Sequence, residues 1–477
     1  MTMSESAAHD APPHSGSVRV RFAPSPTGDL HLGSALVALA NAAFVRATHG
    51  VFVLRIDDTD QERSDPELTR AIINELQWLG ISWDEGPLLQ SERAAHYQRA
   101  LDQLVRDGHV YPCFCSEARL DEVREAQRSA GQPPRYDGAC RELTAENVTA
   151  RIEGGARPAM RLRVPTRDGV IEDLMRGQVA APAGSFGDFI LQRGSGAFMY
   201  QFASVIDDID LGITHVIRGE DHLANTARQL AIFAAMGVEP PAFAHLPLLR
   251  SPAGRKLAKR DPLGTLGQLR DQGYLPEVIR RYLAELLGVG DVDLLAADAA
   301  PFDISRVSVG SAPMVDPARL ASLGRESSAR GGIASALQQL ADAGVSVPPR
   351  WELVVEELMP GAATSRELVA SVQSLLTEPA REDVHAVLEQ IHGSAGPSGD
   401  ALAAILADVI SDHGLDSADD SAAVIAGWKA ASGLTGGVAM RTLRALLTGA
   451  EHGPPLGLIM VAIGTEDALS RLACVAR

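Results

Sequence analysis

An alternation of strand and helix patterns in residues 18–79 restricts the fold of this chain more than any other feature. Residues 18–24 alternate in polarity and end at a proline, which is typical of a strand that enters a loop. From Ser34 the apolar side chains recur at helical spacing, so we predict a helix with Ser34 as its N-cap. Residues 51–56 predict a second strand, and a second helix is expected at about 67–79. This order predicts a parallel α/β sheet.

The rest of the chain divides into segments of different character. Residues 111–190 hold a cysteine cluster, a Gly/Pro-rich stretch and short strand-like runs, which indicates an insertion. From about 263 the pattern is mostly helical. The predicted fold is an α/β N-terminal half with an inserted subdomain, followed by an all-α C-terminal half. The predicted boundaries are a disordered tail 1–17, a first α/β segment 18–110, the insertion 111–190, a second α/β segment 191–262, a connecting helical domain 263–325 and a helical domain 326–477.

Length, charge and cysteine content exclude several classes of protein. The 477 residues fit about three or four domains, and the apolar runs fall short of the ~20 residues that cross a bilayer, so no membrane partner is expected. Four cysteines are too few for a disulfide scaffold, and the first 17 residues lack a signal-peptide core, so we expect a cytoplasmic protein. The net charge of −18 argues against nonspecific nucleic-acid binding but permits a local basic groove.

The loop between the first strand and the first helix offers a nucleotide site. Free N–H groups at a helix start attract an anion, and His31 could donate a hydrogen bond to a phosphate. Gly33 lacks the Cβ that would block a close approach. A histidine before a helix is also often a cap or a surface residue, so this loop alone is a weak signal.

A second loop concentrates the lysines of the chain. Only three of the 43 basic residues are lysine, and two of them, Lys256 and Lys259, lie in the same short segment. Chance or a solvated loop would explain this, but the segment also suits a site that needs compact ammonium groups and not planar guanidinium forks.

Together the two loops resemble the signatures of the class I aminoacyl-tRNA synthetases, in the form of the bacterial-type glutamyl-tRNA synthetases. Residues 23–33 resemble the HIGH region, and residues 256–260 resemble the KMSKS signature. Further segments match family motifs in the same order: 55–64 (an acidic motif), 136–138, 212–223, 272–276 and 441–454. The resemblance implies a Rossmann-type catalytic domain that is split by an acceptor-stem-binding insertion, with an anticodon-binding domain at 326–477.

The resemblance also implies a reaction in two steps. The α-carboxylate of L-glutamate attacks the α-phosphate of ATP, which is expected with Mg²⁺, and gives glutamyl-adenylate and pyrophosphate. A ribose hydroxyl at the 3′ end of tRNA(Glu) then takes the glutamyl group and releases AMP. The implied catalytic residues are His31, Lys256 and Lys259, and the implied ATP-binding set adds Gly33 and Arg260. Positioning and electrostatics carry chemistry of this kind.

Five positions match the amino-acid site of the family. They are Arg21, Ser25, Asp57, Tyr200 and Arg218. We expect Arg21 to pair the side-chain carboxylate of glutamate, Asp57 to accept from its α-ammonium and Tyr200 to wall the pocket. Arg218 is a second candidate for a carboxylate. A buried arginine would also reject glutamine, because a neutral amide leaves the cation uncompensated.

Four departures from the family pattern keep other functions open. Ala258 replaces the signature serine, Asp57 replaces the usual Glu, Ser204 stands where an amide or a small residue is common, and Ser34 with Leu36 and Val37 alters the first signature. One alternative is a truncated relative that glutamylates a modified tRNA nucleoside, although the long helical C-terminal half argues against it. Another is a non-catalytic tRNA-binding paralogue, against which His31 and the lysine pair argue.

Three of the four cysteines are spaced like metal ligands. Cys113 and Cys115 with the later Cys140 suit a structural, tetrahedral zinc site, and some members of the family carry zinc in the insertion. Three buried apolar cysteines are the plainer explanation. The fourth ligand is undecided between Tyr136 and Glu142, of which only Glu142 is already ionised at neutral pH.

The C-terminal half does not reveal its tRNA specificity. Residues 300–477 hold 21 acidic and 12 basic side chains, which is unfavourable for a tRNA surface unless the basic ones share a face. The sequence leaves open whether tRNA(Gln) is also charged. The resemblance suggests a monomer.

Overall fold

The chain forms two units, which are described separately. The computed structural model describes residues 17–59, 65–164, 169–181, 186–307, 312–394 and 396–476. Most of the expected tail and residues 60–64 of the acidic motif lie outside these ranges. Unit 1 comprises Met1–Leu269 and Ile279–Asp316, and unit 2 comprises Arg270–Val278 and Pro317–Arg477. Within the described ranges, every helix is too short or too polar to span a bilayer.

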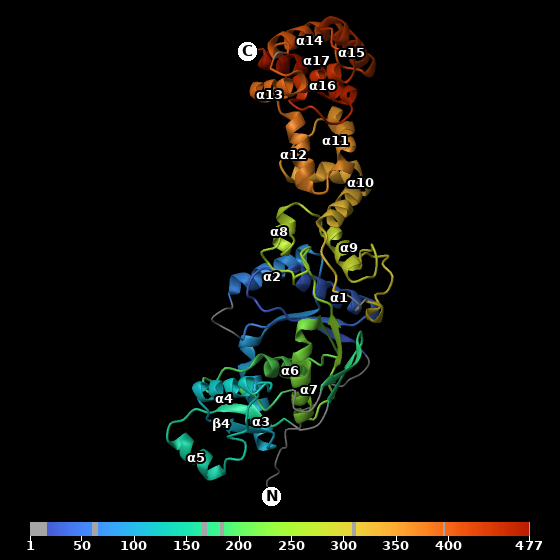
Figure 1. Ribbon diagram of the computed structural model, residues 1–477. Coiled ribbons are helices and arrows are strands. Elements are labelled where there is room, and N and C mark those ends of the chain that lie inside the picture. The colour runs from blue at the N-terminus through green and yellow to red at the C-terminus, as the bar shows by residue number, and fades with distance from the viewer. Residues whose placement is uncertain are drawn as a thin grey trace. The chain divides into compact units, whose positions relative to one another are not determined.

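Unit 1 is built on a seven-stranded sheet in the order β3-β2-β1-β9-β10-β6-β7. Every neighbouring pair is parallel except β6 and β7, which form an antiparallel hairpin at one edge. The predicted parallel α/β sheet is therefore confirmed. Figure 1 shows α1 and α2 on one side of the strands and α6 and α7 on the other. The strands are β1 (Arg19–Phe22), β2 (Val51–Ile56), β3 (Glu85–Leu89), β6 (Gly169–Asp173), β7 (Gly177–Ala181), β9 (His215–Gly219) and β10 (Ala242–Leu246).

The helices of unit 1 connect these strands and cover the sheet. They are α1 (Leu32–Thr48), α2 (Pro66–Trp78), η1 (Gln90–Arg93), α3 (Ala94–Arg106), α6 (Tyr200–Asp210), η2 (Glu220–His222), α7 (Leu223–Met236) and η3 (Ile304–Arg306), with α8 (Leu266–Asp271) and α9 (Pro276–Leu286) at the breaks between the units. The predicted N-cap at Ser34 is wrong. The cap is His31, because its imidazole Nδ1 accepts the Ser34 N–H at 2.9 Å, so the helix starts three residues earlier than predicted.

The expected insertion at residues 111–190 divides between two sheets. β4 (Val110–Cys113), β5 (Ala159–Leu162) and β8 (Phe189–Gln192) form a separate antiparallel sheet, accompanied by α4 (Glu117–Ser129) and α5 (Ala145–Glu153). β6 and β7 instead extend the main sheet, where Asp173 pairs with Phe243 of β10. An open sheet edge offers unpaired N–H and C=O groups, which this hairpin satisfies.

One apolar core joins the main sheet to the three-stranded sheet. It packs one side of the main sheet against α3, α6 and α7, and it includes Val110, Leu162 and Leu191 of the smaller sheet. Phe202 and Val205 of α6 are fully buried in it. The core therefore fixes α6, whose first residue is Tyr200, against the strands that carry the site described below.

Unit 2 is all-α, as predicted for the C-terminal half. Trp428 is fully buried in its larger core, and its indole N–H donates to the Ala439 carbonyl at 2.9 Å. The guanidinium of Arg471 is also buried and donates to the carbonyls of Leu447 and Leu375, near the ends of two helices. Its helices are α10 (Pro317–Asp342), η4 (Pro349–Trp351), α11 (Glu352–Leu358), η5 (Met359–Gly361), α12 (Ser365–Leu376), α13 (Arg381–His392), α14 (Gly399–His413), α15 (Ala418–Ser432), α16 (Gly436–Thr448) and α17 (Leu456–Val475).

Candidate functional site

The first signature loop (residues 23–33) presents the His31 imidazole at the start of α1. Because Nδ1 accepts the Ser34 N–H, the proton of a neutral ring lies on Nε2, where the Ser34 hydroxyl is 3.1 Å away. Desolvation, together with Lys259 and Lys256, lowers the pKa of His31, which favours this neutral ring. A Cβ on Gly33 would lie 3.1 Å from two ring atoms of His31. Glycine at position 33 therefore makes room for the imidazole itself.

The helix start offers fewer free N–H groups than the sequence predicts. The Leu32 N–H donates to the carbonyl of Gly264 at 3.1 Å, and the Ser34 N–H is taken by His31. An anion at this place must therefore depend more on side chains than on the first turn of α1.

The second signature loop (residues 256–260) is a turn stabilised by the carboxylate of Asp261. Asp261 accepts from the Ala258 N–H at 2.8 Å and pairs with Arg255. The flank of the loop forms a hairpin in which the Leu257 N–H donates to Leu249 at 2.9 Å. Lys256 is exposed and its Nζ lies 3.0 Å from Asp221 Oδ2.

Hydrogen bonds and a close approach join the two signature loops. The Leu266 N–H donates to the Leu30 carbonyl at 2.9 Å, beside the Leu32 to Gly264 bond. The ammonium of Lys259 lies so close to Gly28 that a Cβ there would stand 2.6 Å from Nζ. The structure thus places Lys259 against the loop that carries His31, which is the juxtaposition expected from the two signatures.

A cavity of about 200 Å³ lies where β1 and β9 end, beside the first loop. These two strands are neighbours, and the chain leaves them toward opposite edges of the sheet, as at the ligand-binding crevices of other α/β folds. Of the residues proposed from the sequence, the cavity brings together Arg21, Ser25, His31, Gly33, Tyr200, Arg218 and Lys256. Asp57 and the exposed Lys259 and Arg260 do not line it.

Arg218 presents its guanidinium to the cavity from a buried position on β9. Its Nη2 donates to Gln229 at 2.7 Å and to Thr226 at 2.8 Å, and its Nε lies 3.3 Å from His245 Nε2. Its Nη1 has no hydrogen-bond partner among the described residues. Burial lowers the pKa of Arg218 to about 10, against the influence of the nearby Tyr200, so it remains a cation at neutral pH. A cation held this way can bind a carboxylate from a ligand.

Arg21 belongs to a buried charge network with Arg55. The Arg21 Nε lies 3.2 Å from Asp208 Oδ1, and Arg55 Nη1 lies 2.8 Å from the same oxygen. Arg55 also donates to both oxygens of Asp57, at 2.7 and 3.2 Å, and to the Ser204 hydroxyl at 3.2 Å. Arg55 therefore draws the shorter aspartate side chain at position 57 away from the cavity wall.

Burial dominates the electrostatics of this network. It raises the pKa of Asp57 to about 6 although Arg55 acts in the opposite direction. On the other side of the cavity, burial and Arg218 lower the pKa of His222 to about 4, and its Nδ1 lies 3.3 Å from the Tyr200 hydroxyl. The imidazole of His222 is thus neutral at pH 7, and Arg21, Arg218 and Lys256 carry positive charge in the cavity lining.

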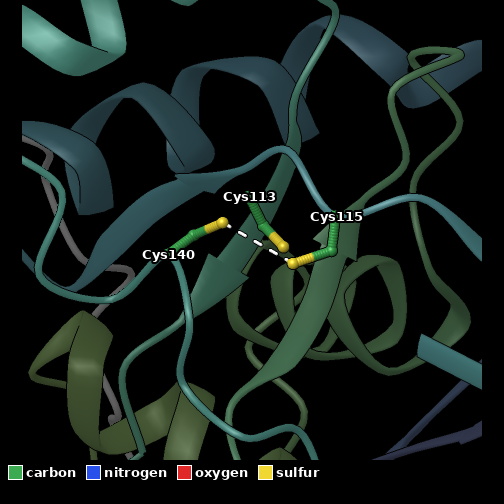
Figure 2. Close-up of side chains that lie close together, drawn as sticks. All are labelled: Cys113, Cys115 and Cys140. Carbon is green, nitrogen blue, oxygen red and sulfur yellow. Dashed lines mark hydrogen bonds between the residues drawn. The ribbon is translucent and has the colours of Figure 1, made fainter. Parts of the chain in front are cut away.

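The three clustered cysteines lie together, as Figure 2 shows. Their sulfur atoms all lie within 4.8 Å of one another, and Cys115 Sγ is 3.6 Å from Cys140 Sγ. The Tyr136 hydroxyl lies 3.5 Å from Cys113 Sγ and 3.6 Å from Cys115 Sγ. Glu142 instead faces solvent and contacts Arg163 at 3.5 Å. Of the two candidates for a fourth ligand, only Tyr136 lies at the cluster.

Sequence reasoning missed Arg55, His222 and the residues that hold Arg218. Arg55 stands in a strand whose other residues are apolar, and a cation in such a strand is a sign of a buried ion pair. His245 and Asp173 are fully covered neighbours in space but 72 positions apart in sequence. No local pattern could have paired them.

Known families and proteins are similar to this chain along most of its length. Residues 17–295 match the family described as tRNA synthetases class I (E and Q), catalytic domain, and residues 316–476 match an anticodon binding domain. The glutamate–tRNA ligase 1 of Halorhodospira halophila is 38% identical over 95% of this chain and 96% of its own length. The glutamate–tRNA ligase 2 of Thermoanaerobacter pseudethanolicus is 46% identical, but the match spans only 57% of each chain.

A solved structure is similar over nearly the whole length. The glutamate tRNA ligase from Elizabethkingia meningosepticum, in complex with its amino acid, matches 96% of this chain and 99% of its own with a TM-score of 0.81 at 27% identity. The catalytic match covers more than half of the chain, and the Halorhodospira relative is similar from end to end. The chain therefore belongs to the class I tRNA synthetases for glutamate and glutamine, with their catalytic domain followed by an anticodon-binding domain.

Proposed function

We propose that this chain is a glutamate–tRNA ligase, which attaches L-glutamate to the 3′ end of tRNA(Glu) through a glutamyl-adenylate. The observation that carries the proposal is the cavity in which two buried arginines, Arg21 and Arg218, face the loop of His31. Glutamate and aspartate are the proteinogenic amino acids that offer two carboxylates and one ammonium to such a site, and the similarity to glutamate–tRNA ligases favours glutamate. The match to curated ligases along 95% of the chain supports the same assignment.

Arg218 and Arg21 bind the carboxylates of glutamate. The Nη1 of Arg218 is the group best placed for this, because its other nitrogen donors are held by protein. Arg21 keeps part of its charge engaged with Asp208 and supplies a second cation. Asp57 accepts from the α-ammonium through a bridging water, since Arg55 holds its carboxylate behind the cavity wall. Glutamine is rejected because it would leave a buried guanidinium without an anion.

The first step joins glutamate to the α-phosphate of ATP. An oxygen of the α-carboxylate attacks the α-phosphorus, the bond to the β-phosphate oxygen breaks, and pyrophosphate leaves. His31 donates its Nε2 proton in a hydrogen bond to a phosphate oxygen, since Nδ1 is taken by the Ser34 N–H. Lys259 and Lys256 neutralise the departing pyrophosphate, and Arg260, Gly33 and Mg²⁺ complete the ATP site. In the second step a terminal ribose hydroxyl attacks the glutamyl carbonyl and AMP leaves.

Zinc fits the cysteine cluster as a structural ion. Four ligands at ~2.3 Å around a tetrahedral zinc lie roughly 3.8 Å apart. Cys115 Sγ lies 3.6 Å from Cys140 Sγ and 3.6 Å from the Tyr136 hydroxyl, that hydroxyl lies 3.5 Å from Cys113 Sγ, and all three sulfurs lie within 4.8 Å of one another. Cys113, Cys115, Cys140 and Tyr136 would hold the ion. Arg119 contacts Cys115 Sγ at 3.4 Å and offsets part of the negative charge of three thiolates. The ion would tie β4 to the segment that carries Cys140 and takes no part in the chemistry.

Charging assays on purified tRNA test the proposal. The wild-type chain, incubated with ATP, Mg²⁺ and labelled glutamate, is expected to charge tRNA(Glu), and the Lys259→Ala variant is expected to lose most of this activity. Parallel reactions with tRNA(Gln) decide whether that tRNA is a second substrate, and light scattering tests the expected monomer. If wild type and Lys259→Ala are equally inert while tRNA still binds, the chain is a tRNA-binding paralogue and not a ligase. The proposed substrates, ATP and tRNA, support the cytoplasmic location that is expected from the sequence.

A further inference from the structure

A buried chain of polar contacts leads from the edge of the main sheet to Arg218. Asp173 ends β6, and its Oδ2 lies 2.6 Å from Nδ1 of His245 on β10. The Nε2 of the same ring lies 3.3 Å from the Nε of Arg218 on β9. The side chains of Asp173 and His245 are both completely covered. These contacts connect the ends of β6 and β10 to the guanidinium of Arg218 on β9.

The Asp173 carboxylate is fixed in orientation. Its Oδ1 accepts the backbone N–H groups of Met175 at 3.0 Å and Arg176 at 2.9 Å, which leaves Oδ2 to face His245. Burial raises the pKa of Asp173, but the hydrogen bond with His245 and those from the two backbone N–H groups lower it below its usual value, so the carboxylate is ionised. An ionised oxygen only accepts hydrogen bonds, so the imidazole must carry a proton on Nδ1.

The tautomer fixed in this way decides what Arg218 meets. Burial and the charge of Arg218 lower the pKa of His245 despite Asp173, so the ring is neutral and Nε2 carries a lone pair. That lone pair can accept the Nε–H of Arg218 and the hydroxyl of Thr226, which lies 3.0 Å away. The opposite tautomer would turn an N–H toward the Nε–H of Arg218. The ring is also stacked on Phe243, with centroids 6.1 Å apart.

We propose that Asp173 and His245 are positioning residues that hold Arg218 so that its Nη1 faces the carboxylate of the substrate. The inference rests on the proposed role of Arg218 in binding glutamate. With Nε held by His245 and Nη2 held by Thr226 and Gln229, the plane of the guanidinium is set by three protein groups. A planar fork held on two sides presents its remaining nitrogen in one direction.

The variant Asp173→Asn tests the tautomer directly. The two backbone N–H groups at Oδ1 demand an oxygen, so the amide N–H₂ of the asparagine must face His245 Nδ1. The ring must then accept at Nδ1 and carry its proton on Nε2, against Arg218. Histidine ¹⁵N NMR of the full chain is expected to show His245 as the Nδ1–H form in wild type and as the Nε2–H form in Asp173→Asn. The resonance is assigned by its loss in His245→Asn.

Kinetics with tRNA, ATP and glutamate then separate positioning from folding. Asp173→Asn is expected to raise KM for glutamate about tenfold or more while KM for ATP stays unchanged. His245→Asn keeps an amide donor for Asp173 but removes the acceptor that faces Arg218, so it is expected to act in the same direction even if Asp173→Asn does not fold. The control Asp303→Asn alters an exposed aspartate that also accepts a backbone N–H, and it is expected to behave as wild type.

A comparison with Arg218→Gln distinguishes failure of the positioning proposal from failure of the proposed role of Arg218. If Arg218→Gln raises KM for glutamate but Asp173→Asn and His245→Asn do not, the pair is merely structural and the proposal is overturned. If Arg218→Gln itself leaves KM for glutamate unchanged, the assignment of Arg218 to the substrate fails first. The double variant Asp173→Asn/Arg218→Gln is expected to be no worse than Arg218→Gln alone.

Discussion

Replacing Arg55 by methionine would remove the cation at the centre of the buried network while keeping a side chain of similar length. The guanidinium is fully buried and contacts Asp57 at 2.7 and 3.2 Å and Asp208 at 2.8 Å. Water cannot replace these contacts, because the pocket around Arg55 is closed by protein. Asp208 keeps its contact with Arg21 at 3.2 Å, so Asp57 is the carboxylate most affected by the loss of the guanidinium.

The expected cost is about 3 kcal/mol of unfolding free energy, the lower end of the range for a buried ion pair that loses one partner. Arg55 holds down the pKa of Asp57, which burial already raises to about 6. Without Arg55 that pKa rises further, and Asp57 becomes protonated at pH 7. A neutral Asp57 no longer attracts the α-ammonium of glutamate, so KM for glutamate is expected to rise as well.

Hydrogen-exchange mass spectrometry and urea unfolding measure this change. Exchange in β2 and α6 is expected to accelerate in Arg55→Met, while unit 2 is unaffected. The control is Arg124→Met, which breaks an exposed ion pair with Asp121 and is expected to cost less than about 1 kcal/mol. Equal unfolding midpoints for the two variants would refute the reasoning, because the burial of Arg55 would then carry no energetic weight.

Three further outcomes follow from the site. Because the pKa of Asp57 is raised to about 6, this carboxylate gains a proton as the pH falls from 7 to 5. KM for glutamate is therefore expected to rise about tenfold per pH unit below pH 6. A KM that does not change across this range would contradict the assignment of Asp57. Gly33→Ala is expected to leave the melting temperature unchanged or to raise it, since alanine favours a helix. It is expected to lower kcat, because the added Cβ would crowd the His31 ring. A variant with the wild-type kcat in steady-state charging would count against the capping geometry. Cys140→Ser is expected to reduce bound zinc, measured by plasma mass spectrometry, from about one to none per chain. It is also expected to raise KM for tRNA more than KM for glutamate, because the cysteine cluster does not line the cavity. Equal zinc content in the wild type and Cys140→Ser would rule out the zinc site.

The sequence predicts the fold and most of the cavity because both depend on local patterns. The strand at residues 51–56 is continuous and apolar, and β2 spans the same residues. Arg21 lies in β1, and Ser25 and His31 follow it closely, so the end of that strand is enough to bring them to one place. The assignment of Arg21 and Ser25 to the amino-acid site, like that of the distant Tyr200 and Arg218, rests on family resemblance.

What could not be predicted depends on contacts between distant segments. β6 lies in the main sheet and not with the rest of the expected insertion, because it pairs with β10. No pattern in residues 169–173 predicts that pairing. The cap was assigned to Ser34 because serine is a usual capping residue, whereas here an imidazole nitrogen of His31 supplies the acceptor. Asp57 was expected at the cavity wall, but Arg55, two positions earlier, draws it aside.

The way the second loop is fastened limits how the enzyme can close around a triphosphate. One flank is pinned by the pairing of Arg250 with Lys256 and the other by Leu32 and Leu30. Only residues 258–263 lie between these anchors, so a closing movement is a short swing that carries Lys259 and leaves the main chain of Lys256 in place. A probe attached within that arc would report nucleotide binding, whereas one attached at either anchor would stay silent.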